Sequence, residues 1–375
     1  MKVIIISRGI PSDTYPLYGI FELDQAKALA KSGIEVALLA IDFRPFAFKR
    51  KYGFFCHETE GVKTYELSLP IGAYRKALPL LSRLTLSAYD KAVKDFGQPD
   101  IIHAHFYFMA AIASFIKSKR HVPLVVTEHS SKLNKNKDEI SKLDIRLAEK
   151  AYANSDRIIA VSSAFANQLH SNFGIRCDVV NNIVSTKSFH YIEKRTENEP
   201  FAFVSVGQLL ENKGHDIVIE AFSKLPENKK MRLFIIGDGP ERCKLEQQIQ
   251  DSKLNENVIL KGQLKREEIQ DVFAHSNAFV LASHSETFGL SYIEAMLSGL
   301  PVIATDCGGP SDFVNKENGI IIACNNANAL AEAMGKMISD IHLYDGKSIS
   351  LKCEEHFSPE TIASKILEIY RQIVK

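Results

Sequence analysis

The chain has 375 residues, of which 45% are apolar and 24% charged, and this length favours two hydrophobic cores over one. Its six cysteines are scattered without a CxxC pair, and no basic-then-apolar leader or bilayer-length apolar run is present, so we expect no zinc site, disulfide framework or membrane span. The net charge of +1 combines +8 over residues 1–190 with −7 over residues 191–375, so either the halves meet different partners or opposite charges help two domains of one chain face each other.

Short apolar strands alternate with helical patterns along the first half of the chain. This alternation predicts a parallel sheet that is covered by helices on both faces. The predicted strands are Val3–Ser7, Ile34–Ala40, Val62–Leu67, Ile101–His105, Leu124–Glu128, Arg157–Val161 and Asp178–Asn181. The predicted helices are Phe21–Lys31, Arg75–Lys94, Phe108–Lys117, Glu139–Ala153 and Ala164–Phe173.

The polar segment Ile192–Pro200 is a predicted linker, and after it the same alternation restarts. We therefore expect two doubly wound sheets, with one domain at residues 1–188 and a second at 199–358, and a final helix at 359–375 that packs back on the first domain. Ligands bind at the carboxyl ends of the strands in such sheets, so the cleft between the two sheets is the expected site. The second-half strands are Phe201–Val206, Leu233–Ile236, Val258–Leu260, Ala278–Leu281, Val302–Thr305 and Ile320–Ala323, and the helices are His215–Lys224, Glu241–Gln250, Glu267–His275, Leu290–Ser298 and Ala327–Ile338.

The most informative stretch, residues 283–305, comprises a strand end, a polar loop, a helix that begins at about Gly289, and another strand. The first turn of a helix has unpaired backbone N–H groups and a positive dipole end, which suit a phosphate. Glu286 lies on the loop and Glu294 about one turn inside the helix, so both carboxylates can reach one cleft and accept hydrogen bonds from sugar hydroxyls. The spacing Ser291-x-x-Glu294 also has the form of a capping box, which would give Glu294 a structural role.

This stretch resembles the signature ExFGLxxxEAMxxGxPVIAT of the group 1 glycosyl transferases, a large family of retaining enzymes that includes bacterial mannosyl-, glucosyl- and N-acetylglucosaminyltransferases. The resemblance implies the GT-B fold, in which two Rossmann-like, doubly wound parallel-sheet domains face each other across a cleft. It also implies that Glu294 binds the ribose hydroxyls of the donor and that Glu286 binds hydroxyls of the donor sugar. The remaining donor-binding positions in this stretch are then Thr287, Phe288, Gly289 and Leu290.

A second motif, residues 207–214, resembles the family's GRxxxxKG loop, whose Arg and Lys neutralise the diphosphate. Lys213 matches this pattern and is expected to bind the donor. Gln208 stands where the family has Arg; its amide can bind phosphate oxygens, but it brings no charge. Arg8, at the end of the first predicted strand, is a candidate substitute for the missing cation. Taken without its flanking glycines and the strand before it, Lys213 would be an ordinary solvated lysine.

The strand end at residues 100–105 resembles the family's DxxHxH element. This resemblance places His105 near the anomeric carbon of the donor sugar. His103 points to the same face of the strand and lies one step deeper, so it is expected to be structural. A lone histidine at a strand end would be an ordinary hydrogen-bonded residue, and only the register of the motif favours a catalytic role for His105.

Two further loops of the first half match family elements less closely. The loop at residues 8–19 occupies the place of the first phosphate-facing turn without the usual Gly-Gly pair, and Gly19 is expected to present its amide to the donor. The strand end Thr127-Glu128-His129 resembles the TxH element, which places His129 on the acceptor side. The turn Gly237–Pro240 resembles the family's GDGP turn and is expected to be scaffold.

Together these resemblances imply a hexosyltransferase that moves a hexose or N-acetylhexosamine from a nucleotide-diphosphate sugar to a glycan or lipid-linked glycan acceptor in cell-surface polysaccharide synthesis. They also imply retention of the anomeric configuration, with His105, Glu286 and Lys213 as catalytic residues. The sequence has no DxD-like cluster at a strand end, so we expect no metal, and no cofactor besides the donor substrate. No nucleic-acid partner is expected.

The basic first half is the expected acceptor side. Its loop Phe43–Lys51 is basic and aromatic, which suits an anionic lipid carrier or an anionic membrane surface, or else a charged, solvated face. We therefore expect a cytoplasmic protein, with peripheral contact with the inner face of the membrane as one interpretation. The helix that follows carries Arg75, Lys76, Arg83, Lys91 and Lys94.

Three other functions fit parts of the pattern. A nicotinamide enzyme would need GxGxxG directly after a strand, and no such run follows the first predicted strand of either half. A non-hydrolysing sugar-nucleotide epimerase shares the GT-B shape and the ligand but uses no acceptor. A non-catalytic nucleotide-sugar-binding partner of another transferase is consistent with Gln208 in place of Arg.

Overall fold

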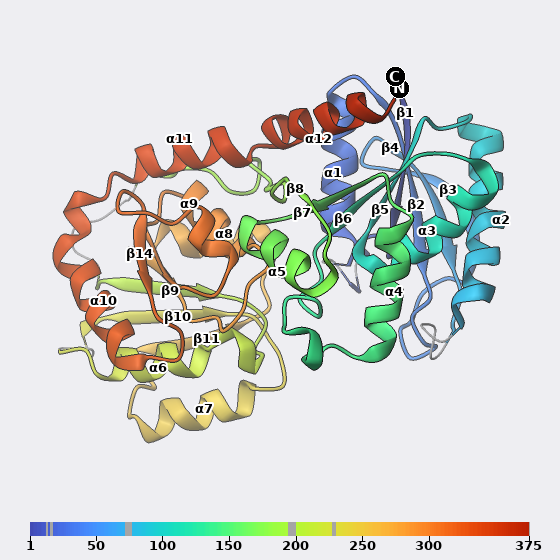
Figure 1. The fold of residues 1–375 in the computed structure, drawn as a ribbon. Coiled ribbons are helices and arrows are strands. Elements are labelled where there is room, and N and C mark those ends of the chain that lie inside the picture. The colour runs from blue at the N-terminus through green and yellow to red at the C-terminus, as the bar shows by residue number, and fades with distance from the viewer. Residues whose placement is uncertain (13, 16–17, 72–76, 194–199, 227–229, 375) are drawn as a thin grey trace. The chain divides into compact units, whose positions relative to one another are not determined.

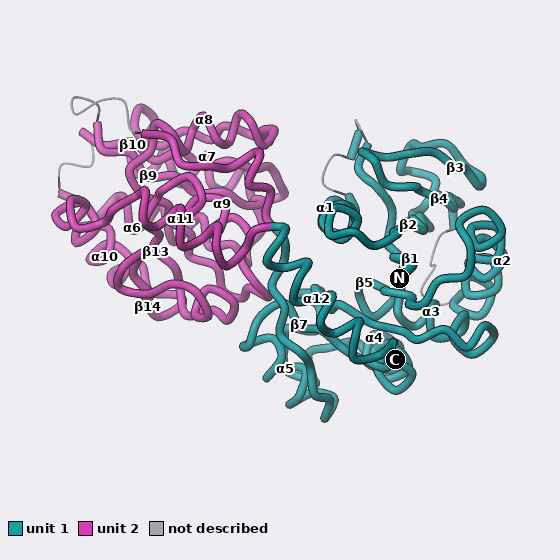
Figure 2. The backbone as a smooth tube through the Cα atoms, turned by 90° about the horizontal axis from the view of Figure 1, so that it is seen from above, with its two compact units in different colours: residues 1–183, 359–375 teal, residues 184–358 magenta. Residues whose placement is uncertain are grey.

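In the computed structural model of this chain, residues 1–12, 14–15, 18–71, 77–193, 200–226 and 230–374 are described. They form two compact units, each treated by itself: unit 1 is Met1–Ile183 with Pro359–Lys375, and unit 2 is Val184–Ser358 (Figure 2). Most of the predicted linker at 192–200 lies outside the described residues, as do Arg75 and Lys76. Among the described helices, none is both long enough and apolar enough to cross a membrane.

Unit 1 is built on a sheet with the strand order β3-β4-β2-β1-β5-β6-β7-β8, and helices cover it (Figure 1). All neighbouring strands are parallel except β3 and β4, which are antiparallel. The strands are β1 (Lys2–Ser7), β2 (Glu35–Asp42), β3 (Gly53–Thr59), β4 (Val62–Ser68), β5 (Ile101–His105), β6 (Leu124–Glu128), β7 (Arg157–Ala160) and β8 (Asp178–Val179). The helices are α1 (Ile20–Lys31), α2 (Leu78–Phe96), α3 (Phe106–Arg120), α4 (Lys142–Ala153), α5 (Ser163–Phe173) and α12 (Pro359–Ile373), with a short 3-10 helix η2 (Lys137–Glu139).

The edge strand β3 is absent from the prediction. It forms a hairpin with β4 in which Thr59 pairs with Val62 across the turn residues Glu60 and Gly61, whose φ angles are 48° and 82°. The strand is mostly exposed, so it lacks the continuous apolar run that identifies the buried strands. The signal in the sequence is the Glu-Gly pair, because a two-residue hairpin turn requires positive φ at both positions.

The C-terminal helix α12 packs against α1 in unit 1, although the two helices lie at opposite ends of the chain (Figure 1). Ile362, Ile366 and Tyr370 are fully buried and share a core cluster with Val3 and Leu29. Their spacing of four residues places them on one helix face. Each fully buried apolar side chain contributes about 1.5–3 kcal/mol, so this face anchors the end of the chain to the first sheet.

Unit 2 contains a wholly parallel sheet with the strand order β11-β10-β9-β12-β13-β14, which is the 3-2-1-4-5-6 order of a doubly wound fold (Figure 1). The strands are β9 (Ala202–Val206), β10 (Arg232–Ile236), β11 (Val258–Gly262), β12 (Ala278–Leu281), β13 (Val302–Thr305) and β14 (Gly319–Ile322). The helices are α6 (His215–Ser223), α7 (Arg242–Asp251), α8 (Arg266–Ala274), α9 (Leu290–Leu297), α10 (Ala327–Asp340) and α11 (Gly346–Phe357), with short 3-10 helices η3 (Glu211–Lys213), η5 (Gly309–Asp312) and η6 (Ile341–Leu343).

Helix α11 is also absent from the prediction. Asp345 caps it by accepting hydrogen bonds from the backbone N–H groups of Lys347 and Ser348. The helix packs against α9, and its last residue, Phe357, lies 5.7 Å from the ring of Phe288. Helix α11 therefore packs against the segment that carries the signature motif and supports it.

Candidate active site

The two candidate sites lie where each sheet reverses its winding. In unit 2 the neighbours β9 and β12 form this switch point, because β10 and β11 extend the sheet to one side and β13 and β14 to the other. In unit 1, β1 and β5 play the same part, with β2 and β6 as their outer neighbours. Ligands in doubly wound sheets bind beyond the carboxyl ends of the strands at this point, since the loops diverge there and leave a crevice. The loops after β9 and β12 carry Lys213 and Glu286, Arg8 follows β1, and His105 is the last residue of β5.

The unit 2 site brings Lys213 and Glu286 into direct contact. Nζ of Lys213 lies 2.6 Å from Oε1 of Glu286, and Oγ of Ser283 donates to the same oxygen at 2.8 Å. The side chains are 22% and 10% exposed, so the pair is sheltered but reachable from solvent. An ammonium group can pair with a phosphate oxygen as it does with a carboxylate oxygen, so Lys213 is chemically suited to an anionic ligand.

Backbone contacts fix the spacing of the two loops. The N–H of His284 donates to the carbonyl of Asn212 at 2.9 Å, which joins the Lys213 loop to the Glu286 loop. The N–H of Leu209 donates to the carbonyl of Asp238 at 3.0 Å, so the turn after β10 supports the loop from the other side. His215 begins α6 as a buried residue, and burial lowers its pKa to about 4, which keeps the ring neutral beside Lys213.

Helix α9 begins at the site without a side-chain cap. Its N-cap is Gly289, which adopts a φ of 99° that favours glycine and has no side chain to accept a hydrogen bond from the first turn. A Cβ at this position would lie 2.9 Å from the Tyr292 ring, so the tight turn depends on glycine. Phe288 buries its ring against Phe313 and Phe357, and only its backbone remains for a ligand. The first turn therefore offers N–H groups and a positive dipole end to an anion.

The other predicted unit 2 residues surround this helix start. Thr287, Leu290 and Glu294 are half-buried, with Glu294 just past the first turn of α9. The capping-box interpretation of Glu294 is not what α9 uses at its start, since the N-cap is Gly289 and not Ser291. Gln208 is exposed on the loop after β9.

The unit 1 site is a cluster of three nearly parallel histidine rings. His105 and His129 lie 5.1 Å apart between ring centroids, and His105 and His103 lie 4.8 Å apart. Nδ1 of His105 is 2.9 Å from Nε2 of His129, and Nε2 of His103 is 2.7 Å from Oγ1 of Thr127. Both nitrogens of His105 are paired and its side chain is fully buried, so a direct contact between this ring and a sugar requires a neighbour such as His129 to move aside.

All three rings are held in the neutral state. Burial lowers the pKa of His103 to about 3 and that of His129 to about 3, with the Arg8 charge as a second cause at His129. Burial also places the pKa of His105 well below its ordinary value, and the two other rings lower it further. A neutral imidazole has one N–H and one bare nitrogen, so each ring is both donor and acceptor.

Arg8 is engaged within unit 1. Its guanidinium lies 3.9 Å from the centroid of the Phe106 ring and its Nε lies 3.4 Å from the fully buried carboxylate of Glu22. Phe106 has a φ of 67°, a left-handed conformation that is strained for an aromatic residue and is often found at functional sites. Gly19 is buried at the N-cap of α1, and Glu22 occupies the first turn of that helix. A phosphate at Gly19 would therefore meet a carboxylate as well as a cation.

Glu128 organises the backbone around His129. Its carboxylate accepts hydrogen bonds from the backbone N–H groups of Tyr107, His129 and Ser130 and from the hydroxyl of Tyr152, at 2.7–3.1 Å. Burial raises the pKa of Glu128 to about 7, and these hydrogen bonds act in the opposite direction. From the sequence, Glu128 is predicted only as part of the TxH element, and Gln25, Glu22 and Phe106 are not predicted as site residues. The available signal for Gln25 and Glu22 is a pair of polar residues inside the buried face of α1.

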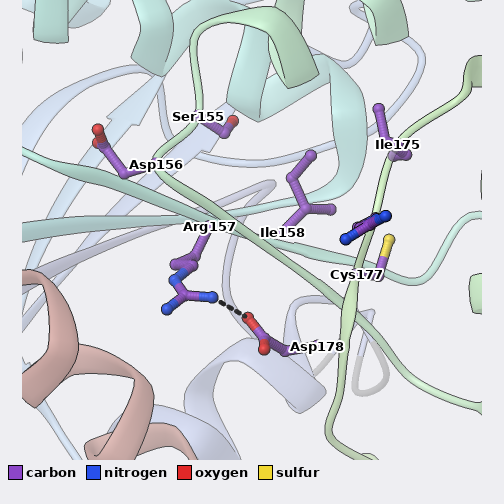
Figure 3. A pocket seen from close by; sticks show the side chains of 8 residues that line it. Ser155, Asp156, Arg157, Ile158, Ile175, Cys177 and Asp178 are labelled. Atoms are coloured by element: carbon purple, nitrogen blue, oxygen red, sulfur yellow. Dashed lines mark ion pairs between the residues drawn. The ribbon is translucent and has the colours of Figure 1, made fainter.

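A hollow of about 530 Å³ lies elsewhere in unit 1 (Figure 3). It is at the amino ends of β7 and β8, where Arg157 and Asp178 form an ion pair at 3.6 Å. Ligands in doubly wound sheets bind at the opposite, carboxyl edge, so this hollow does not belong to the candidate site. It is lined by Ser155, Asp156, Arg157, Ile158, Ile175, Arg176, Cys177 and Asp178.

Comparison with known proteins gives matches to both halves of the chain. Residues 188–345 match the family described as glycosyl transferases group 1, and residues 22–188 match glycosyltransferase family 4. The chain is 28% identical over 360 residues to the putative teichuronic acid biosynthesis glycosyltransferase TuaC of Bacillus subtilis, covering 89% of this chain and 88% of that protein. It is 30% identical over 281 residues to the uncharacterized glycosyltransferase MJ1178 of Methanocaldococcus jannaschii, covering 73% and 76%.

Solved structures share the fold over the whole chain. Sucrose-phosphate synthase of Thermosynechococcus elongatus has a TM-score of 0.83 at 20% identity, with 100% of this chain and 99% of that chain covered. Alr3699/HepE of Anabaena, solved in complex with UDP, has a TM-score of 0.77 at 20% identity, with 99% of each chain covered. At this level of identity the likeness concerns the fold.

Proposed function

The chain belongs to the group 1 glycosyl transferases, and from that premise we propose that it transfers a hexose or N-acetylhexosamine from a nucleotide-diphosphate sugar to a glycan or lipid-linked glycan, with retention of configuration. The predicted GT-B fold is confirmed by the two doubly wound units and by the structural neighbours. No metal or further cofactor takes part in the reaction we propose.

The observation that carries the proposal is the arrangement at the switch point of unit 2. Lys213, Glu286 and the uncapped start of α9 converge there. As the bond between the sugar and the diphosphate breaks, negative charge grows on the departing oxygen. A fixed ammonium group and helix N–H groups stabilise that charge without rearranging, which lowers the barrier. In this proposal Glu286 releases Lys213 to the diphosphate and turns to the sugar hydroxyls, while Glu294 holds the ribose.

The unit 1 cluster is proposed to face the reacting sugar and the acceptor. His105 and His129 supply neutral hydrogen-bonding groups there, and Arg8 adds a positive charge held in place by Glu22 and Phe106. A neutral ring suits a sugar hydroxyl, which both donates and accepts hydrogen bonds.

A thermal-shift screen tests donor binding. We expect one of UDP-, GDP- or ADP-sugars to stabilise the protein by about 2.7 kcal/mol at a hundred times its Kd. Glu294→Ala should abolish that shift because the ribose loses its acceptor, whereas the exposed Glu332→Ala on α10 should retain it.

The outcomes of this screen separate the candidate functions. No shift with any nucleotide sugar would refute the proposal. Stabilisation of a protein that consumes no donor, with or without candidate acceptors, would instead favour a non-catalytic binding partner. Release of an isomerised donor would favour an epimerase.

We also propose that unit 1 contacts an anionic membrane through α2. Leu80, Arg83, Lys91 and Lys94 are exposed, and their spacing places them on one face of the helix. In the loop between β2 and β3, Phe46 is 73% exposed, which suits insertion between headgroups. The loop arginines Arg44 and Arg50 both pair with Asp42, so the positive charge of this surface comes from α2 and from the exposed Lys49 and Lys51.

Vesicle flotation measures this contact. The protein should float with phosphatidylglycerol vesicles and not with phosphatidylcholine vesicles, since each basic residue near an anionic surface contributes about 1 kcal/mol. Reversing Arg83, Lys91 and Lys94 to Glu should abolish flotation. The same reversal of the exposed Lys142, Arg146 and Lys150 on α4 is the control, and equal loss in both variants would rule out a specific α2 surface.

A further inference from the structure

Gln25 joins the histidine rings of unit 1 to one another. Its side chain is buried on α1, and its amide Nε2 lies 3.2 Å from Nδ1 of His103 and 3.2 Å from Nε2 of His105. The same Nδ1 of His103 lies 2.5 Å from the hydroxyl of Tyr370, which α12 brings back to the first sheet. One amide nitrogen thus contacts two buried imidazoles.

The hydrogen-bonding capacity of these groups fixes the direction of each bond. An amide nitrogen carries hydrogens and does not accept, so the ring nitrogens that face it carry none, and the lone pair on Nδ1 of His103 is shared between the Gln25 amide and the Tyr370 hydroxyl. His103 therefore has its hydrogen on Nε2, which donates to Thr127, and His105 has its hydrogen on Nδ1, which donates to Nε2 of His129. The single hydrogen of His129 is then left on Nδ1.

The end of this chain of bonds is a buried donor. Nδ1 of His129 is covered from solvent and makes no hydrogen bond of ordinary geometry, with the side chain of Asn182 beside it. A buried donor without an acceptor costs about 1–3 kcal/mol, so an oxygen that reached it would bind favourably. The ring itself is half-buried, unlike His103 and His105.

We propose that Gln25 is a positioning residue: by donating to His103 and His105 it sets the tautomers of three histidines, so that the N–H of His105 is directed to His129 and the N–H that is left for an oxygen atom of the sugar substrates is Nδ1–H of His129. This inference rests on the proposed function for its consequence, whereas the tautomers themselves do not depend on it. With its hydrogen on Nδ1, the His129 ring can donate to a hydroxyl or ring oxygen, and it cannot remove a proton through that same nitrogen. In enzymes, the hydrogen-bond partner of the ring nitrogen that faces away from the substrate sets the tautomer of an imidazole. This partner has a large effect on the reaction rate, because the wrong tautomer presents a lone pair where an N–H is needed.

The test is the ¹⁵N spectrum of histidine-labelled, donor-free protein, in which the one-bond and two-bond couplings show which nitrogen of each ring carries the hydrogen. We expect His103 as the Nε2–H form and His105 and His129 as Nδ1–H forms, identified by single substitutions. The signals of His103 and His129 should remain those of neutral rings from pH 8 to pH 5, because burial lowers the pKa of each ring to about 3. An Nε2–H form of His105 in the wild-type protein would overturn the proposal.

Gln25→Glu provides the matched perturbation, since it keeps the shape and replaces donors by acceptors. At least one of His103 and His105 should move its hydrogen to the nitrogen that faces residue 25. With the donor found by the thermal-shift screen, kcat should fall at least about tenfold while KM stays within about twofold. Gln168→Glu on α5, an amide in unit 1 whose contacts are with Lys135 and Asn172, is the control and should change neither.

Unchanged tautomers and an unchanged kcat in Gln25→Glu would refute the positioning role. If the tautomers follow the expectation but no donor is consumed by the wild-type protein, the assignment of Gln25 stands and the proposed transferase function fails. The two outcomes are therefore distinguishable.

Discussion

Replacing Lys213 with alanine is expected to lower kcat by about a thousandfold, the largest effect of any single side chain in unit 2. The ammonium group lies 2.6 Å from Glu286 and beside the start of α9, so it is the fixed positive charge closest to where the diphosphate would leave. Gln208 adds none, because it stands where the family pattern has Arg. Removal of Lys213 also leaves a nearly buried carboxylate without its cation, which by itself costs several kcal/mol. The measurement is steady-state turnover of the donor.

The partner Glu286 separates the binding and chemical contributions of this pair. Glu286→Ala should retain nucleoside diphosphate binding and lose transfer, because the lysine remains while the contact with the sugar hydroxyls is gone. The double variant should be no slower than the worse single variant, since both remove one functional unit. Lys224→Ala, an exposed lysine on the same unit that pairs with Glu220, is the control. Near wild-type turnover in Lys213→Ala, or loss of diphosphate binding in Glu286→Ala, would show that these roles are wrong.

The elements that sequence predicts well are the ones buried on both faces. The continuous apolar runs of β1 and β9 leave little room for another interpretation, and both strands lie at the centre of their sheets. β3 lies at an edge with exposed side chains, and α11 has a weakly apolar face that packs on α9, so neither has the periodic pattern that reveals an element. The order of the strands comes from long-range pairing, to which local pattern gives no access.

The candidate site also contains residues that local sequence predicts and contacts that only the folded chain creates. Lys213, Glu286 and Glu294 stand out because they fall at matching positions of two short motifs that resemble those of the group 1 glycosyl transferases, and such a match depends only on local sequence. The contact of Gln25 with His103 and His105 joins residues about 80 positions apart, and that of Tyr370 joins positions 267 apart. Such contacts depend on which helix face covers which strand end. The sequence predicts His103 as structural; its bonds to Thr127 and Tyr370 show what structure it supports.

Replacing Gly214 with alanine is expected to lower the stability of the folded protein strongly, because the backbones of the two loops of unit 2 pack closely at this residue. Gly214 is the N-cap of α6 with a φ of 63°, and a Cβ there would lie 2.1 Å from the carbonyl oxygen of Ala282, which follows β12. A left-handed conformation costs alanine about 1–2 kcal/mol, and forcing the two backbones apart adds about 1–3 kcal/mol. The melting temperature should fall by roughly 5–15 °C, since each kcal/mol shifts a unit of this size by about 2–4 °C.

Gly335→Ala is the matched control for this substitution. Gly335 lies within α10, and no atom approaches the position of its Cβ within 4 Å, so alanine there should stabilise the protein by up to about 1 kcal/mol through helix propensity. The opposite signs of two chemically identical changes would isolate the loop contact as the cause.

Because Gly214 is next to Lys213 and Ala282 is next to Ser283, any Gly214→Ala protein that folds should also bind the donor more weakly, as the lysine and the α9 start move apart. Equal melting temperatures for the two variants would show that the loops can separate freely, and a site that depends on their fixed spacing would then be untenable.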